Sequence, residues 1–323
     1  MKQILIKEND AGQRLDRLLG RYLKEAPKSF LYRMLRKKNI ILNGKKADGS
    51  ERLSPGDEIR VFFSDETWDK FAGKQEDTGK AEFPRANLDI IYEDEHVLLV
   101  NKPPGMLSQK AKASDISLNE YVLGYLQRGG QWKESDPFRP SVCNRLDRNT
   151  SGIVVCGKSL PGLRVMSQVL RDRSLHKYYR CLVKVALREE QYLEGYLWKD
   201  PAANRVRILN KEQEGAQYIA TEYRPVGRVR EDTLLEVCLI TGRSHQIRAH
   251  LASTGHPVVG DTKYGDPEVN DRYRKEYGLK SQFLHSFRLE LPELPAPLEA
   301  LSGRVFEAEF PPVMRRILDK KGT

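Results

Sequence analysis

One carboxylate in this chain stands in a setting suited to chemistry. The run Cys143-Asn-Arg-Leu-Asp-Arg-Asn-Thr-Ser-Gly152 places Asp147 between Arg145 and Arg148, and the residues that follow, Ile-Val-Val-Cys, are typical of a buried strand. Neighbouring cations favour the charged form of a carboxyl group. We therefore expect Asp147 to act as a nucleophile or an electrostatic stabiliser rather than as a proton donor. The alternative interpretation of this run is a solvated surface ion pair.

Two further segments combine aromatic or cationic residues with strand and helix signals. In the run from His176 to Val183, Tyr179 lies on an expected strand just after a helix. Residues 241–250 read Thr-Gly-Arg-Ser-His-Gln-Ile-Arg-Ala-His and lead to a second glycine-bounded run at 260–265. There Arg243 precedes a helix expected at 245–254, and the start of a helix favours anions.

Other kinds of site fit the sequence poorly. Residues 152–159 match the letters of a phosphate-binding loop, but the residues between the glycines are stiff and strand-forming, so they cannot curl around an anion. His245 and His250 are five residues apart and do not share a helical face for zinc. We expect no metal and no cofactor. The four cysteines are scattered and are expected to be reduced and buried.

The elements that position these segments follow from their patterning. Strands are expected at 88–92, 97–100, 178–185 and 233–240, and Ser159 is expected to cap a helix. Many strands with few, unevenly spaced helices indicate an α+β domain on a mixed or antiparallel sheet. We assign this larger domain to residues 87–323. Residues 66–86 are polar and lack periodicity, which predicts a linker.

The first 65 residues are a distinct basic unit. Leucines at helical spacing predict a helix over 15–23, and Ser29 is expected to cap a second helix. A short strand at 40–42, an Asn43-Gly44 hairpin turn and a strand at 58–62 follow. The unit resembles the small α-L type RNA-binding domain first described in ribosomal protein S-four. The cations of this unit are then expected to bind RNA: Arg33, Arg36, Lys37, Lys38, Lys45 and Lys46. The alternative is that they form an ordinary solvated helix face.

Charge and composition agree with an RNA partner. The 323 residues include 55 basic and 45 acidic residues, a net charge of +10, and residues 1–65 alone hold 15 basic against 9 acidic residues. Such a balance favours a polyanion. No apolar stretch is long enough to span a membrane, and the first residues carry no signal-peptide pattern. We expect a cytoplasmic protein with no membrane partner.

Three segments taken together resemble the RluA-type pseudouridine synthases. The family pattern His-Arg-Leu-Asp-x-x-Thr-Ser-Gly is similar to residues 144–152, Lys-x-Tyr-x-Ala to 177–181, and Thr-Gly-Arg-x-His-Gln-Ile-Arg to 241–248. A Leu-His element matches Leu284 and His285. The resemblance implies a mixed, largely antiparallel catalytic sheet. Two departures are Asn144 where most members have His, and Cys181 where Ala is usual, and they predict altered RNA contacts.

The resemblance also implies roles. Asp147 would be the catalytic aspartate, Tyr179 would stack on the target uracil and assist proton removal, and Arg243 would pair with Asp147. Arg145 would fill the gap left in the RNA by the extruded nucleotide. Three alternatives stay open. Tyr179 could be an ordinary aromatic residue of a strand. Arg248, also expected to contact RNA, could replace Arg243 as the partner of Asp147, and Leu284, expected to pack against the site, could be plain core.

The function implied by the resemblance is the isomerisation of specific uridines to pseudouridine, with large-subunit ribosomal RNA as the main expected substrate. Two alternatives are the same chemistry on transfer RNA, and a non-catalytic RNA-binding protein of ribosome assembly. We expect a monomer that needs no DNA partner.

Overall fold

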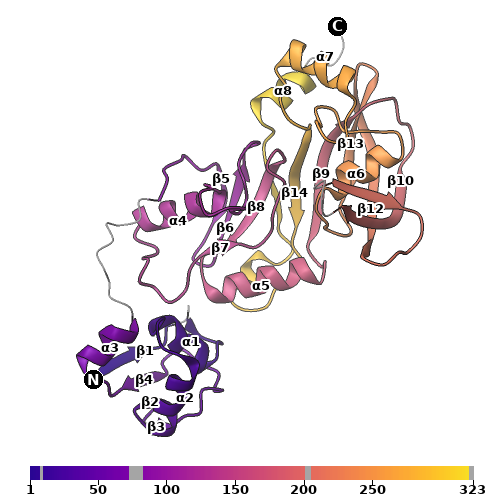
Figure 1. Ribbon diagram of the computed structural model, residues 1–323. Coiled ribbons are helices and arrows are strands. Elements are labelled where there is room, and N and C mark those ends of the chain that lie inside the picture. The colour runs from indigo at the N-terminus through magenta and orange to yellow at the C-terminus, as the bar shows by residue number, and fades with distance from the viewer. Residues whose placement is uncertain (8–9, 73–82, 201–204, 320–323) are drawn as a thin grey trace.

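The computed structural model describes residues 1–7, 10–72, 83–200 and 205–319. The first part of the chain folds around a small sheet of its own, in which the strands pair antiparallel in the order β1-β4-β2-β3 (Figure 1). Its elements are β1 (Lys2–Leu5), α1 (Leu15–Tyr22), α2 (Lys28–Arg36), β2 (Ile40–Leu42), β3 (Lys45–Lys46), β4 (Glu58–Val61) and α3 (Asp65–Ala72).

Helical spacing of apolar residues produces the core of this part. Helix α1 buries Leu15, Leu18 and Leu19 on one face. The predicted hairpin turn is confirmed, since Asn43 and Gly44 both have positive φ, at 51° and 72°, as a tight turn of primed type requires. The predicted cap at Ser29 is wrong. Helix α2 starts at Lys28 after Pro27, whose ring fixes φ near the helical value, here −58°.

A helix lies where an aperiodic linker was predicted. Helix α3 covers the beginning of the 66–86 range, and its Trp68 and Phe71 pack against the core of the first sheet. Because these two aromatic residues are three positions apart, they share one face of the helix. The sequence prediction missed them among the surrounding charges. Part of the remaining linker range, 73–82, lies outside the described residues.

The second part is built on one large sheet of 11 strands. The strand order is β11-β10-β12-β13-β9-β14-β8-β6-β5, with β15 on β14 and β7 on β8. Among the described residues, only β14 and β8 pair in parallel, which agrees with the predicted mixed, largely antiparallel sheet. The strands are β5 (Ile90–Glu93), β6 (Val97–Lys102), β7 (Ser141–Val142), β8 (Ser151–Gly157), β9 (His176–Val183), β10 (Gln191–Asp200), β11 (Arg205–Leu209), β12 (Ala216–Val229), β13 (Asp232–Cys238), β14 (Leu284–Glu290) and β15 (Val305–Glu307).

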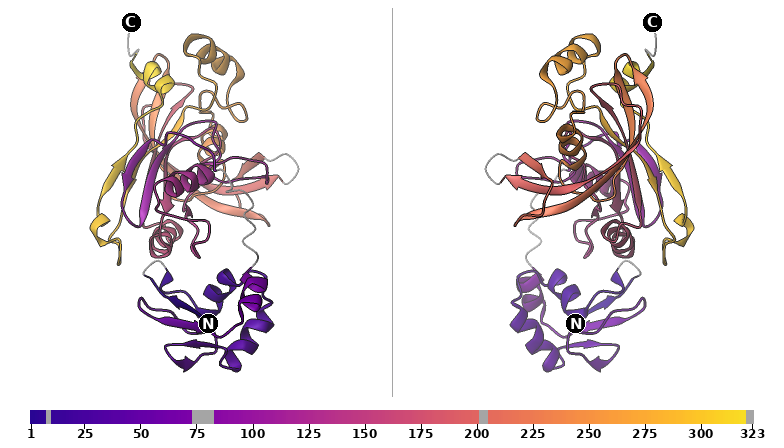
Figure 2. Two further views of the ribbon diagram at one scale, coloured as in Figure 1. Left: turned by 90° about the vertical axis from the view of Figure 1, so that its left-hand side faces the viewer. Right: turned by 90° about the vertical axis from the view of Figure 1, so that its right-hand side faces the viewer.

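Helices and turns cover this sheet. Both side views show the first part of the chain at one end of the second part (Figure 2), and there Arg164 donates to the carbonyl of Ala11 at 3.3 Å. Ser159 caps the following helix as predicted, since its hydroxyl accepts a hydrogen bond from the amide of Gly162. No helix in the described ranges is both long and apolar enough to span a bilayer. The helices are α4 (Leu118–Arg128), α5 (Leu160–Arg171), α6 (Gln246–Ser253), α7 (Pro267–Tyr277), the 3-10 helix η2 (Glu299–Leu301) and α8 (Pro312–Asp319).

Strand β8 is buried along its whole length, which explains its uninterrupted apolar sequence. All seven of its residues are buried, and β6 and β14 flank it in the sheet. Gly152 at its start has a φ of 113°, and a Cβ there would lie 2.1 Å from the carbonyl oxygen of Ser286. Only glycine allows β14 to approach so closely. The strand rules out the phosphate-binding loop that its letters suggested.

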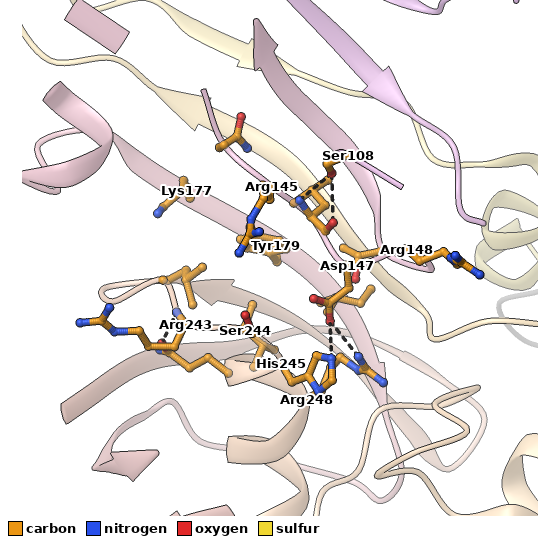
Figure 3. A pocket seen from close by; sticks show the side chains of 18 of the residues that line it. Ser108, Arg145, Asp147, Arg148, Lys177, Tyr179, Arg243, Ser244, His245 and Arg248 are labelled. Carbon is orange, nitrogen blue, oxygen red and sulfur yellow. Dashed lines mark hydrogen bonds and ion pairs between the residues drawn. The ribbon is translucent and has the colours of Figure 1, made fainter. Parts of the chain in front are cut away.

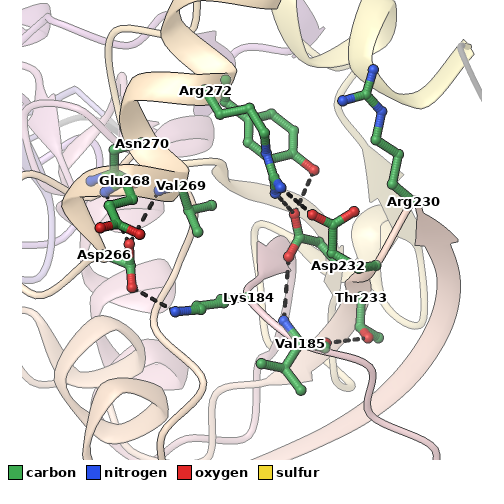
Figure 4. A network of polar contacts seen from close by, with 12 residues as sticks. Lys184, Val185, Arg230, Asp232, Thr233, Asp266, Glu268, Val269, Asn270 and Arg272 are labelled. Carbon is green, nitrogen blue, oxygen red and sulfur yellow. Dashed lines mark hydrogen bonds and ion pairs between the residues drawn. The ribbon is translucent and has the colours of Figure 1, made fainter.

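Polar contacts anchor helix α7 to the sheet (Figure 4). Asp232 is fully buried at the start of β13 and accepts hydrogen bonds from Arg272 at 2.8 Å and from the Tyr273 hydroxyl at 2.7 Å. At the N-terminal end of the helix, Asp266 caps α7 and pairs with Lys184 at 2.6 Å. The segment that precedes α7 is thereby fixed against the sheet, and this segment enters the site described next.

Candidate active site

The loop that carries Asp147 joins β7 to β8 and is fixed at several points. The Ser108 hydroxyl donates to the carbonyl of Leu146 and accepts from its amide, both at 3.0 Å. Asn144, at the position where the family usually has His, accepts from the amide of Val155 at 2.8 Å and donates to the carbonyl of Ile153 at 3.3 Å. The Asn144 side chain therefore ties this loop to β8.

A buried lysine lies beneath the same loop. The Lys102 ammonium donates to the carbonyl oxygens of Pro103, Met106 and Arg148 at 2.8 to 3.1 Å. Burial lowers the pKa of Lys102 to about 7, and the charge of Asp147 acts in the opposite direction. Lys102 was not among the residues expected at the site. Its only signal was a lysine placed at the end of an apolar strand.

Asp147 forms an ion pair with Arg248 of helix α6 (Figure 3). The Arg248 Nη1 atom donates to Asp147 Oδ2 at 2.7 Å. The other side of the guanidinium donates to both oxygens of the fully buried Asp261, at 2.7 and 2.8 Å. One arginine is thus held between two carboxylates, and its bond to Asp147 fixes the orientation of the Asp147 carboxylate at the cavity.

Burial and pairing act in opposite directions on this triad. Burial lowers the pKa of Arg248, but the bonds to Asp261 and Asp147 outweigh it and raise that pKa. Burial likewise raises the pKa of Asp261, and the bonds from Arg248 turn the net change downward. Both groups therefore stay charged at neutral pH.

One prediction about an arginine is wrong. The partner of Asp147 is Arg248, the alternative left open, and not Arg243, because Arg248 lies on the inner face of α6 while Arg243 precedes the helix and is exposed. Figure 3 shows the Arg243 side chain pointing away from Asp147. Arg248, also expected to contact RNA, is 8% exposed, is bonded to carboxylates on both sides and lines the cavity, and its RNA contact stays a prediction.

His245 joins the site through backbone geometry that the sequence did not reveal. It has a left-handed φ of 58° at the start of α6, which begins at Gln246, one residue later than predicted. Its Nδ1 lies 2.9 Å from the Tyr264 hydroxyl, and its Nε2 lies 4.0 Å from Asp147 Oδ2. Burial lowers the pKa of His245. A neutral imidazole therefore faces the carboxylate at pH 7.

Tyr179 and Leu284 form the apolar side of the site. Both are buried, at 6% and 3% exposure, and both belong to the main core of the sheet while also lining the cavity. Burial raises the pKa of Tyr179 to about 12, so the phenol is protonated at neutral pH. Lys177 lines the same cavity, and burial lowers its pKa.

These side chains surround a cavity of about 570 Å³, a volume within the range of ligand sites. Asp147, Tyr179, Arg145, Arg243 and Leu284 all line it. Arg145 is exposed at its edge. Within the described residues, no group of three His, Cys, Asp or Glu side chains is placed to hold a metal ion.

The cations predicted to bind RNA in the first part of the chain lie at its surface. They occupy the end of α2 and the β2–β3 hairpin, far in sequence from Asp147. All six are exposed, and none forms an ion pair in the described ranges: Arg33, Arg36, Lys37, Lys38, Lys45 and Lys46. They remain available to a polyanion.

Known proteins are similar to this chain in both sequence and fold. A family model described as RNA pseudouridylate synthase matches residues 96–253. The chain is 31% identical over 304 residues to ribosomal large subunit pseudouridine synthase C of Vibrio cholerae, across 91% of this chain and 92% of that one. The protein of the same name from Escherichia coli is 32% identical over 296 residues, across 90% and 88%.

Two solved human structures show a similar fold. RNA pseudouridylate synthase domain containing 4 has a TM-score of 0.56 at 20% identity, over 71% of this chain and 91% of that chain. RNA pseudouridylate synthase domain containing 1 has a TM-score of 0.50 at 22% identity, over 72% and 94%. Because the bacterial relatives exceed 30% identity over nearly their whole length, this chain belongs to the RluA-type family of RNA pseudouridine synthases, which are isomerases.

Proposed function

We propose that this protein converts uridine to pseudouridine in large-subunit ribosomal RNA, with Asp147 as the catalytic carboxylate. The observation that carries the proposal is the position of Asp147, fixed by Arg248 in a cavity that Tyr179 also lines. The substrate class rests on the bacterial relatives, whose names specify the large ribosomal subunit.

The reaction breaks the bond from ribose C1′ to N1 of the uracil and forms a bond from C1′ to C5. The hydrogen on C5 leaves as a proton, and N1 gains a proton. Positive character develops at C1′ as the first bond breaks, so a carboxylate at Asp147 either stabilises that centre or attacks the nucleoside covalently. Arg248 is a positioning residue, because it orients the carboxylate and does not need to touch the substrate.

The detached uracil must turn while it stays in the cavity. Tyr179 offers a buried aromatic surface for this step, and its protonated phenol favours stacking over direct proton abstraction. The target nucleotide must leave its stack first, at a cost of a few kcal/mol. We assign Arg145, exposed at the edge of the cavity, to the gap that the nucleotide leaves.

The basic surface of the first part of the chain would offset that cost. Contacts to phosphates add affinity without reading sequence. We propose that the chain has three parts: an RNA-binding unit at 1–65, a connecting segment at 66–86 and a catalytic unit at 87–323. Helix α3 packs on the first unit, so the connecting segment in this proposal begins with an ordered helix.

The test replaces Asp147 with Asn, which preserves shape and removes the charge. Ribosomal RNA carrying tritium at uracil C5 is incubated with the full-length protein, and tritium release is measured. We expect a loss of at least about 1,000-fold. Asp271→Asn is the matched control, since Asp271 is a half-buried residue of α7 that pairs with Arg274 and Lys275 and does not line the site. An Asp147→Asn variant with wild-type release would refute the assigned role.

The same assay separates the alternatives. A non-catalytic assembly protein would release no tritium from any RNA. Pseudouridine mapping in strains with and without the gene distinguishes ribosomal from transfer RNA targets, because only the true substrate loses modified positions in the deletion strain.

A further inference from the structure

A second cavity adjoins the one that contains Asp147. It measures about 320 Å³, at the small end of the range for ligand sites. Arg145 and the turn at 242–244 line both cavities, so the two cavities are direct neighbours. The remaining walls come from β10, β11 and β12, together with Gly215 just before β12.

The register of these strands places the lining residues on one face. Leu197 pairs with Gln217 across β10 and β12, and Lys199 pairs with Val206 across β10 and β11. Leu197 and Lys199 are two residues apart on one strand, so their side chains point the same way. Leu197 and Val206 are buried, at 5% and 7% exposure. They form an apolar floor beside the exposed Lys199 and Gln217.

Uncompensated positive charge surrounds this floor. Arg145, Lys199 and Arg243 all line the cavity and are exposed. None of the three forms an ion pair with a carboxylate in the described part of the chain. Arg248, which lines the first cavity, behaves differently, because it pairs with two carboxylates. Three unpaired cations around one hollow attract an anion, and an apolar floor beside them suits a flat ring.

We propose that this second cavity binds the nucleotide next to the target uridine. Lys199 and Arg243 hold its phosphate, and its base lies on Leu197 and Val206. Gln217 can both donate and accept hydrogen bonds, so it can orient a base edge. The inference rests on the proposed function, because it places one nucleotide in each cavity of a single RNA strand. It also gives Arg243 a role in place of the pairing with Asp147 that the structure excludes.

Substitutions at the two cations test the inference in the full-length protein. The variants are Lys199→Ala, Arg243→Ala and the double variant. Lys211→Ala is the matched control, because Lys211 is an exposed lysine on the turn after β11 and does not line either cavity. The substrate is large-subunit ribosomal RNA labelled with tritium at uracil C5. The measurements are kcat/KM for tritium release and RNA affinity by filter binding over a series of salt concentrations.

Each single cavity variant should lower kcat/KM about tenfold and reduce the salt slope of affinity by about 0.7. Lys211→Ala should stay within about twofold of wild type. If both cations hold one phosphate, the double variant loses less than the product of the single losses. If the double variant instead loses the full product of the two single losses, the idea that both cations hold one phosphate is overturned.

The proposed function and this inference fail in different ways. A wild-type protein that releases no tritium refutes the proposed function. A wild type that is active, with Lys199→Ala and Lys211→Ala indistinguishable in rate and affinity, overturns the second site alone. If the wild type is inactive, the affinity measurements still decide, since loss of affinity confined to the cavity variants supports the site and its absence overturns it.

Discussion

Asp261 is the residue whose replacement tests the structural support of the site most directly. In the Asp261→Asn variant the carboxylate becomes an amide of the same shape. Asp261 accepts two bonds from Arg248, at 2.7 and 2.8 Å, and bonds from the amides of Lys263 and Tyr264 at 2.8 and 3.2 Å. Asn keeps an oxygen for the backbone amides but turns an NH₂ group toward the guanidinium, so at least one charge-assisted bond is lost.

The magnitude follows from burial. Removing one partner of a buried ion pair costs about 3–5 kcal/mol. Arg248 retains Asp147 as a second partner, so we expect the lower end, about 3 kcal/mol of unfolding free energy. Arg248 also loses the anchor that orients Asp147, and a displacement of about 1 Å at a catalytic group can cost about 100-fold in rate. We expect a loss of that order in kcat.

The assay combines chemical unfolding with tritium release. The lowered pKa of Asp261 adds a pH signature. Its contribution to stability is present above the ordinary value of 3.8 and is lost as pH falls through the lower folded-state value. The acid limb of the stability profile should therefore be flatter in the variant. Asp271→Asn serves as the control, because it removes a carboxylate that pairs within α7 and lies outside the site. Wild-type stability together with wild-type kcat in Asp261→Asn would refute the reasoning.

Three further predictions concern pH, the Asp147 loop and RNA affinity. Burial lowers the pKa of His285 from 6.5 to about 4, so its full contribution to the free energy of unfolding should be present above pH 6.5 and about 3 kcal/mol should be lost toward pH 4. Unfolding measured over a range of pH should show that His285→Gln abolishes this dependence. Asn144→Ala leaves the amide of Val155 without its 2.8 Å partner, so it should lower the unfolding free energy by about 1 kcal/mol and slow tritium release. No change in either quantity would contradict the role of Asn144 in holding the Asp147 loop to β8. Replacing both Arg36 and Lys37 with Ala should weaken RNA binding and lower the salt slope of the affinity by about 1.4 to 1.8, measured by filter binding. An unchanged slope would show that these two cations do not contact RNA phosphates.

Local patterns in the sequence were enough for much of the fold. The cap at Ser159, the Asn43-Gly44 turn and the main strands depend on neighbours within a few residues, and the structure confirms them. Ser29 and α3 show the limit. Helix α2 begins after Pro27, whose ring fixes the backbone, and not after the expected cap Ser29. Helix α3 forms in a charged segment because Trp68 and Phe71 pack against the core of the first sheet.

The sequence by itself determined which residue types meet at the site, because motif order and spacing select Asp147, Tyr179 and the segment at 241–248. Only the tertiary structure decided which arginine pairs with Asp147. Arg243 precedes helix α6 and is exposed, whereas Arg248 lies on the helix and is buried between two carboxylates. The second carboxylate, Asp261, comes from a segment fixed by contacts of α7 with the sheet, and such long-range packing leaves no mark in local spacing.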